Sequence, residues 1–207
     1  MRLTRLVPFV FLMLPGACAS GADEGTGRAG DGVGKGASGR PAMAWDHHPE
    51  AADWTAAGLA FLTGSDAGIA LVRQVPADIA RWCPAYPRNA PPERAAFWVG
   101  LLAALAGHES TWNPQAVGGG GRWFGLVQIS PATARGYGCA ATSGAELQEG
   151  RANITCALRI IGRTVARDGV VAAGGGGVAA DWGPFLHADK RAQMRAWISR
   201  QSYCRQE

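Results

Sequence analysis

The sequence has few charged side chains and lacks the motifs of several large classes of protein. Only 17% of its 207 residues are charged, and 20 basic against 16 acidic residues leave a formal net charge of +4. No basic cluster with interleaved aromatic residues is present, so we expect no nucleic-acid partner. The chain also lacks an internal repeat, a phosphate-binding loop and a Ser-His-Asp arrangement. The function must therefore be inferred from local motifs.

Long apolar runs are missing too, apart from a short one near the N-terminus. Two arginines precede an apolar run over residues 6–14, which is too short to span a bilayer and is followed by small residues. This pattern is typical of an exported precursor, so we expect a signal peptide over residues 1–19. Two alternatives remain open. Cleavage before Cys18 would produce a lipoprotein lipidated at that cysteine, which we slightly favour, and ordinary cleavage would come before Ser20.

Cysteine is scarce, and its count of five is odd. Four cysteines remain when Cys18 is set aside, and in an exported chain they predict two disulfides with three possible connectivities. We expect Cys139 to pair with Cys156, which would close a short loop, and Cys83 to pair with Cys204, which would tie the two ends of the domain. The spacings are not those of a zinc site and the histidines are scattered, so we expect no metal and no cofactor.

The arrangement of apolar residues predicts one mainly helical domain. Residues 20–52 are rich in Gly, Ala, Asp and Ser, which indicates a flexible tether, and residues 53–207 are expected to form the domain. No long alternating pattern of the kind that strands show is present. Helices are expected over residues 53–70, 76–82, 93–107, 131–137, 153–168 and 190–200.

Glu109 lies at the end of the most informative of these predicted helices. Steps of four residues from Leu101 lead to Leu105 and then to Glu109, so a carboxylate falls on the apolar face of the helix over residues 93–107. Loss of water and the negative end of the helix dipole would both raise its pKa. A protonated carboxyl of this kind can act as a general acid on a glycosidic oxygen. The alternative is a solvated or paired glutamate, and we interpret His108 as structural or solvated.

Three motifs follow one another in order around this residue. The first contains Glu-Ser, an aromatic residue and a proline, at Glu109, Ser110, Trp112 and Pro114. The second has the form Gly-Leu-x-Gln-Ile followed by Pro-x-Thr-Ala, at Gly125, Leu126, Gln128, Ile129, Pro131, Thr133 and Ala134. The third is Asn153-Ile154 at the start of a helix. In this order and spacing they resemble the catalytic domain of lytic transglycosylases of the soluble lytic transglycosylase (SLT) type, over about residues 95–185.

The resemblance implies a single lysozyme-like domain and a specific reaction. An enzyme of this type cleaves the β-1,4 bond between N-acetylmuramic acid (MurNAc) and N-acetylglucosamine (GlcNAc) in peptidoglycan and leaves 1,6-anhydro-MurNAc ends. Glu109 would act first as the acid and then as the base. Ser110 would position the acid or the substrate, and Gln128 would bind the sugar together with backbone groups of Gly125, Leu126 and Ile129. The alternative for these residues is ordinary capping and turn chemistry.

Aromatic side chains add a second indication of a carbohydrate ligand. Trp112 and Trp123 flank a run of four glycines at residues 118–121, and the face of an indole ring can carry a sugar ring. We therefore include both tryptophans among the expected substrate contacts. The glycine run is either an adaptable loop edge or a simple connector.

The last motif of the family, Ala-Tyr-Asn-x-Gly, is altered in this chain. The corresponding residues are Ala179-Ala180-Asp181-Trp182-Gly183, so Ala180 replaces the tyrosine and Asp181 replaces the asparagine. If Asp181 assists a water molecule, a lysozyme-type muramidase that hydrolyses the same bond becomes a second hypothesis. Asp181 could equally stabilise a turn. A third hypothesis is a non-catalytic glycan-binding protein of the envelope.

All three hypotheses share a partner and a location. Glycan strands of peptidoglycan are the expected partner, with attachment to a membrane through lipidated Cys18 as an option. The expected location is the bacterial cell envelope or periplasm, either as an outer-membrane lipoprotein or as a secreted protein. The sequence indicates no protein partner, no oligomeric state and no preference between chain ends and internal bonds.

Overall fold

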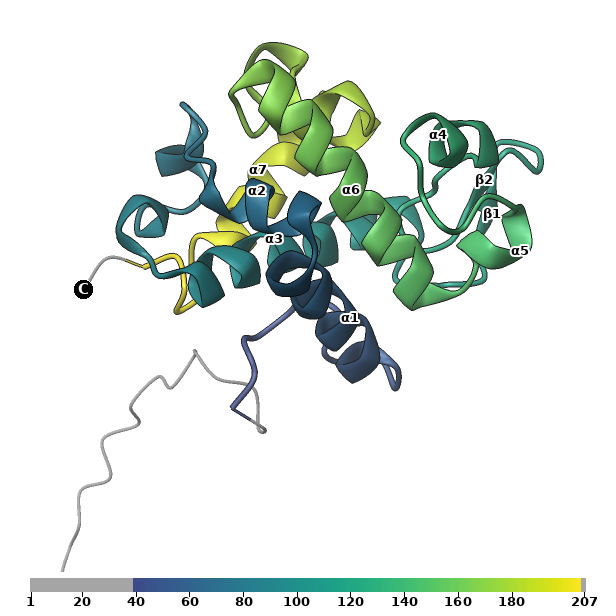
Figure 1. Ribbon diagram of the computed structural model, residues 1–207, viewed down its shortest axis with the longest axis horizontal. Coiled ribbons are helices and arrows are strands. Elements are labelled where there is room, and N and C mark those ends of the chain that lie inside the picture. The colour runs from purple at the N-terminus through teal and green to yellow at the C-terminus, as the bar shows by residue number, and fades with distance from the viewer. Residues whose placement is uncertain (1–38, 206–207) are drawn as a thin grey trace, which may run out of the picture. The chain divides into compact units, whose positions relative to one another are not determined.

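Two long helices, α3 (Pro91–Glu109) and α6 (Gly150–Asp168), organise the fold. The computed structural model describes residues 39–205. Within them, α3 starts at a proline pair that suits a first helical turn, and every residue from 95 to 106 is buried. Such a helix must be covered on all sides, and α3 does contact α1, α2, α6 and α7 (Figure 1). Its C-terminal residue is Glu109.

The remaining elements are shorter. The other helices are α1 (Ala51–Gly64), α2 (Asp66–Arg73), α4 (Pro131–Gly136), α5 (Gly144–Leu147) and α7 (Ala188–Ile198). Short 3-10 turns cover Ile79–Arg81, Tyr86–Arg88, Ala173–Gly175, Gly177–Ala180 and Gly183–Phe185. The predicted helices over residues 93–107, 131–137, 153–168 and 190–200 are confirmed to within a few residues. The predicted helix over residues 76–82 is wrong, because that segment forms only the turn Ile79–Arg81.

The prediction of one helix over residues 53–70 is also wrong. Ser65 is extended, and it divides this segment into α1 and α2, which meet at a bend of 85°. Its hydroxyl accepts a hydrogen bond from Gly68 N at 3.0 Å and so caps the start of α2. Among residues 39–205 no single helix is long and apolar enough to cross a membrane, although this bent pair passes the same test of length and composition.

The folded domain begins earlier than residue 53. Met43 and Trp45 are both buried, and the indole Nε1 of Trp45 donates to Thr55 Oγ1 at 2.9 Å. Trp45 also packs edge-on against Trp54, with 5.8 Å between the ring centroids. The C-terminal part of the expected tether over residues 20–52 is therefore part of the core. The rest of that tether, the expected signal peptide over residues 1–19 and Cys18 lie outside the described residues.

A small hairpin stands beside the helical part. Strands β1 (Val117–Gly118) and β2 (Trp123–Phe124) pair antiparallel, with Gly118 opposite Trp123. Three glycines between the strands, Gly119 to Gly121, have positive φ angles, which glycine adopts without strain. The hairpin, α4 and α5 gather beside α6 (Figure 1). This cluster places the second motif next to the end of α3.

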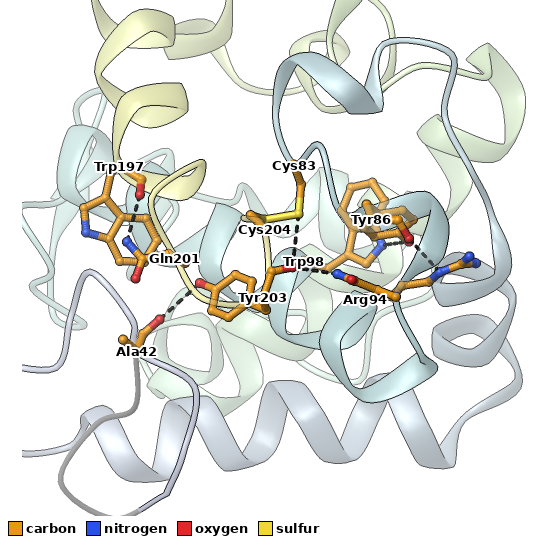
Figure 2. Close-up of a disulfide and its surroundings, with 10 residues drawn as sticks. Ala42, Cys83, Tyr86, Arg94, Trp98, Trp197, Gln201, Tyr203 and Cys204 are labelled. Atoms are coloured by element: carbon orange, nitrogen blue, oxygen red, sulfur yellow. Dashed lines mark hydrogen bonds between the residues drawn. A yellow bond between two sulfur atoms is a disulfide. The ribbon is translucent and has the colours of Figure 1, made fainter. Parts of the chain in front are cut away.

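Two disulfides staple the domain, in the pairs that we expected. Cys139 is bonded to Cys156, which ties the segment after α4 to α6. Cys83 is bonded to Cys204 across 121 residues (Figure 2). Next to it, the Tyr203 hydroxyl donates to the carbonyl of Ala42 at 3.1 Å, so the C-terminal segment also fastens the N-terminal one.

Candidate active site

Glu109 lines a cleft of about 420 Å³ at the C-terminal end of α3. The elements α3 and α7 provide what we name the helix wall: His108, Glu109, His187 and Lys190. The hairpin, the second motif and the last motif provide what we name the loop wall: Gly118, Gly119, Trp123, Gln128, Asp181, Trp182, Gly183 and Pro184. The first and second sequence motifs, together with the altered last motif, thus contribute to one cavity.

The environment of Glu109 favours its protonated form. Burial raises the pKa of the Glu109 carboxyl from 4.5 to about 7, and the ammonium of Lys190 opposes this rise. Near neutral pH the carboxyl can therefore both hold and release a proton. A general acid that later serves as a base needs a pKa in this range.

Three backbone positions near Glu109 are unusual. Thr111, Trp112 and Gln128 have positive φ angles of 53°, 57° and 51°, and they are the only non-glycine residues between 39 and 205 that do. A side chain makes this conformation costly, and such residues often cluster at functional sites. Here they turn the chain sharply just after α3 and within the second motif.

Asn153 holds the second motif in place from the first turn of α6. Its Oδ1 accepts from Val127 N at 3.0 Å, and its Nδ2 donates to the carbonyls of Phe124 and Leu147 at 3.0 and 2.8 Å. Gly125 passes so close to it that a Cβ there would collide with the Asn153 amide. The third motif thus supports the second through a fully buried amide.

Ser110 and the apolar residues of the second motif have supporting positions. The Ser110 hydroxyl donates to the carbonyl of Leu126 at 2.8 Å and so links the end of α3 to the second motif. Leu126 and Ile129 are buried in the core. None of these three residues, nor Gly125, lines the cleft of Glu109. They position the residues that do.

Gln128 and Trp123 line the cleft as predicted contacts of a sugar. The Gln128 Nε2 donates to the carbonyls of Gly125 and Ala116 at 2.9 and 3.2 Å, so its amide is fixed. Trp123 is 43% exposed, and the guanidinium of Arg122 lies over its ring at 5.0 Å. A partly exposed indole ring in the same cleft as a fixed amide is a surface that suits a sugar ring.

Asp181 also lines the cleft, and it has a partner that the sequence did not reveal. The Tyr137 hydroxyl, 44 residues away, donates to Asp181 Oδ2 at 3.0 Å. Burial, together with this carboxylate, raises the pKa of Tyr137. Next to Asp181, the indole of Trp182 is buried and donates to the carbonyl of Val127 at 2.8 Å. The altered last motif is therefore tied to both α4 and the second motif.

The structure does not bring Trp112 into this cleft. After the two positive φ angles its ring turns back onto α3, where its Nε1 donates to the carbonyl of Ala103 at 2.9 Å. The ring fits over Gly107, where a Cβ would be 2.7 Å away. Trp112 lines a separate cavity of about 220 Å³ together with Trp197. The prediction that Trp112 contacts substrate beside Glu109 has no support from this geometry.

Three titratable side chains of the cleft were absent from the predicted site: His108, His187 and Lys190. His108 was interpreted as structural or solvated, yet it lines the cleft, and burial followed by the charge of Lys190 lowers its pKa. His187 and Lys190 belong to the start of α7, about 80 residues from Glu109. The only sequence signal for Lys190 is its position, since a cation in the first turn of a helix opposes the helix dipole.

Comparison with known proteins agrees with this geometry. A structure of wild-type DslA (Bd0314) matches with a TM-score of 0.71 and 25% identity, over 80% of this chain and 98% of DslA. Two glutamate-to-glutamine mutants of DslA match with TM-scores of 0.71 and 0.69, at 25% and 24% identity, each over 79% of this chain and 97% of DslA. No curated protein sequence matches the chain. The fold is a single, disulfide-stapled, lysozyme-like domain.

A family model gives a second match. Residues 89–173 match the transglycosylase SLT domain. The chain therefore carries an SLT-type domain, which indicates a transglycosylase-type enzyme. The matched region contains Glu109, Gln128 and Asn153 and ends before Asp181, so the altered last motif lies beyond it. Among residues 39–205 no group of three His, Cys, Asp or Glu side chains is arranged to hold a metal ion.

Proposed function

We propose that this protein is a peptidoglycan lytic transglycosylase. It cleaves the MurNAc-β-1,4-GlcNAc bond and leaves 1,6-anhydro-MurNAc ends, with Glu109 as the single acid and base. The observation that carries this proposal is the half-buried Glu109 carboxyl, whose pKa burial raises to about 7 in a cleft of the SLT-type domain.

The reaction needs one group that gives a proton and then takes one. The Glu109 carboxyl protonates the glycosidic oxygen as the bond from C1 of MurNAc to that oxygen breaks, so GlcNAc leaves with a free hydroxyl. The carboxylate of Glu109 then takes the proton of the C6 hydroxyl while O6 bonds to C1, which restores the acid. Lys190 supports the ionised form between the two steps, because its charge lowers the pKa of Glu109.

The loop wall would hold the sugar during these steps. The partly exposed ring of Trp123 can pack against a pyranose ring, and the missing side chains of Gly118 and Gly119 leave room for the Gln128 amide and the Trp123 ring themselves. The Gln128 amide is fixed through its Nε2, and its Oε1, next to Gly118, can accept a hydrogen bond from a hydroxyl or acetamido group. Ser110 contributes by joining α3 to this wall.

A muramidase that hydrolyses the same bond is the second candidate, because Asp181 lines the same cleft as Glu109. Its Oδ2 already accepts a hydrogen bond from Tyr137, while Oδ1 has no hydrogen bond among the described residues. That free oxygen could orient water or stabilise positive charge on the sugar.

We further propose that the protein works in the bacterial cell envelope. The pattern of residues 1–19 supports export, and two disulfides within the domain suit an oxidising compartment. Lipidation at Cys18 would attach the enzyme to a membrane. Replacement of Cys18 by serine, followed by fractionation of cells, tests this attachment: a lipoprotein moves from the membrane fraction to the soluble fraction.

Mass spectrometry of the released sugars tests the activity. Purified peptidoglycan is digested with the protein and, in parallel, with Glu109→Gln. Products that end in 1,6-anhydro-MurNAc, absent with the variant, are the expected result. Reducing MurNAc ends would identify a muramidase instead. Release of no product by either protein would contradict both candidates and favour the non-catalytic glycan-binding protein.

A further inference from the structure

The helix wall of the cleft contains a cation that the reaction at Glu109 does not fully explain. Lys190 lines the cleft between α3 and the start of α7, with His108 and His187 among the other lining residues. Its charge affects the pKa of both Glu109 and His108, so it lies within electrostatic range of both. It is the only lysine or arginine among the residues that line this cleft.

The position of Lys190 is electrostatically unfavourable, and its ammonium has no bonding partner in the described part of the chain. It lies in the first turn of α7, where the helix dipole disfavours a positive charge. It is half-buried, yet in the described part of the chain its ammonium forms no hydrogen bond and no ion pair within 4 Å. Of the two acids in the cleft, Glu109 keeps a proton up to about pH 7, and Asp181 forms no ion pair with Lys190 within 4 Å. An unpaired cation in a binding cleft is arranged to receive an anion.

The expected substrate carries a suitable anion near the bond that is cleaved. MurNAc bears a lactyl ether, and this group ends either in a free carboxylate or in a peptide with carboxylates of its own. We propose that Lys190 binds a carboxylate on the muramoyl substituent next to the scissile bond, with His108 and His187 beside it. This inference rests on the proposed substrate, and it makes Lys190 a specificity-determining residue for anionic glycan strands.

The histidines fit a supporting role in such a site. Burial and Lys190 lower the pKa of His108, so its ring is neutral near pH 7 and can donate one hydrogen bond without adding charge. The charge of the site then comes from Lys190. A lysine ammonium has three donors on a flexible stem, which suits a carboxylate whose position varies from strand to strand.

Binding measurements on an inactive background test this inference without relying on catalysis. The full chain with Glu109→Gln is titrated with three muramoyl tetrasaccharides by calorimetry: peptide-free with free lactyl carboxylates, peptide-bearing, and peptide-free with the carboxylates converted to methyl amides. We expect Lys190→Gln to weaken binding of the carboxylate ligand by about tenfold, as loss of one charge-assisted hydrogen bond implies. The methyl-amide ligand should bind both proteins equally.

Two further variants serve as controls. Lys190→Arg keeps the charge and should retain binding. Arg163→Gln removes one positive charge from an exposed position of α6 outside the cleft and should leave binding unchanged. Comparison of the two carboxylate ligands then identifies the source: a loss confined to the peptide-free ligand indicates the lactyl carboxylate, and a loss confined to the peptide-bearing ligand indicates a peptide carboxylate.

Equal affinities of Lys190→Gln and Arg163→Gln for all three ligands would overturn the inference, and so would absence of binding by the parent Glu109→Gln. The proposed reaction fails separately, if the protein with Glu109 intact releases no sugar from peptidoglycan. A chain that binds carboxylate ligands through Lys190 but cleaves nothing would keep this inference and lose the enzymatic one.

Discussion

The helix wall and the loop wall of the cleft are built in different ways. Glu109 and Lys190 belong to the regular helices α3 and α7, whose backbone hydrogen bonds form within each helix. In the loop wall, Gln128 has a left-handed backbone conformation. A side chain at position 118 would collide with the Gln128 amide, so this position requires glycine. Buried Asn153 holds the second motif through hydrogen bonds to its backbone. Acid chemistry is thus placed on a rigid scaffold, while sugar contacts depend on a tertiary network. The two walls should therefore fail in different ways when they are altered.

The largest expected effect concerns the acid of the helix wall. Glu109→Gln should lower the rate of glycan cleavage by about 10²- to 10⁴-fold, because the amide cannot donate the required proton. Release of soluble fragments from purified peptidoglycan gives the rate. Glu93→Gln, at an exposed position in the first turn of the same helix, is the matched control and should keep the wild-type rate. Equal rates for the two variants would remove Glu109 from the mechanism.

Changes that disturb the loop wall should lower the stability of the protein. Asn153→Ala leaves the backbone groups of Val127, Phe124 and Leu147 without their partner, so we expect the free energy of unfolding to fall by about 3 kcal/mol. Urea unfolding followed by tryptophan fluorescence measures this change. Asn113→Ala, at an exposed turn, should cost much less. A cost for Asn153→Ala no larger than that of the control would show that the second motif is held by other contacts.

Glu109 should also make stability depend on pH, in the direction opposite to an ordinary carboxylate. Its pKa is about 7 in the folded state against 4.5 as the reference, so the folded state binds the proton more tightly. The wild-type protein therefore loses stability as pH rises from about 4.5 to about 7. Glu109→Gln should be more stable than wild type by about 2 kcal/mol at pH 8 and should show no advantage at pH 4. A constant difference across this range would contradict the raised pKa.

Lys190 should move the pH dependence of catalysis. Its charge lowers the pKa of Glu109, so Lys190→Gln should extend activity to higher pH, because the acid keeps its proton longer. The rate is measured against pH on a substrate with neutralised carboxylates, so that the proposed contact of Lys190 with a substrate carboxylate does not contribute. Because His108, His187 and Asp181 also line the cleft, the shift is taken as the difference between the variant and wild type. Arg163→Gln should leave the profile in place. A shift of the basic limb to lower pH in Lys190→Gln would have the wrong sign for this account.

The smallest effect is expected at Asp181. A transglycosylase needs no second carboxylate, so Asp181→Asn should change the rate by less than about threefold. Tyr137→Phe, which removes the hydrogen bond to Asp181, should have an equally small effect. The rate on peptidoglycan checks both. A loss of about 10²-fold in Asp181→Asn would instead support the muramidase, in which this carboxylate assists water.

The features that the sequence predicts follow the same division. Glu109 could be placed because helical periodicity is local, and steps of four from Leu101 predict which face it shares. The break at Ser65 was missed although Gly64 and Ser65 are residues that commonly end one helix and cap the next. Trp112 was assigned to the cleft, but the left-handed backbone at Thr111 and Trp112 turns its ring onto Gly107 instead. Neither position is a glycine, so the sequence contains no signal for these positive φ angles.

The sequence by itself determined the helical class and the position of the acid, since these depend on periodicity and on motif order, and it favoured the two disulfide pairs without excluding the other connectivities. Only the tertiary structure decided the rest of the cleft. It brought Lys190 and His187 from α7 to Glu109, joined Tyr137 to Asp181, and removed Trp112 from the site. These contacts join residues far apart in the chain. They are determined by the packing of the helices around α3 and cannot be derived from local conformational preferences.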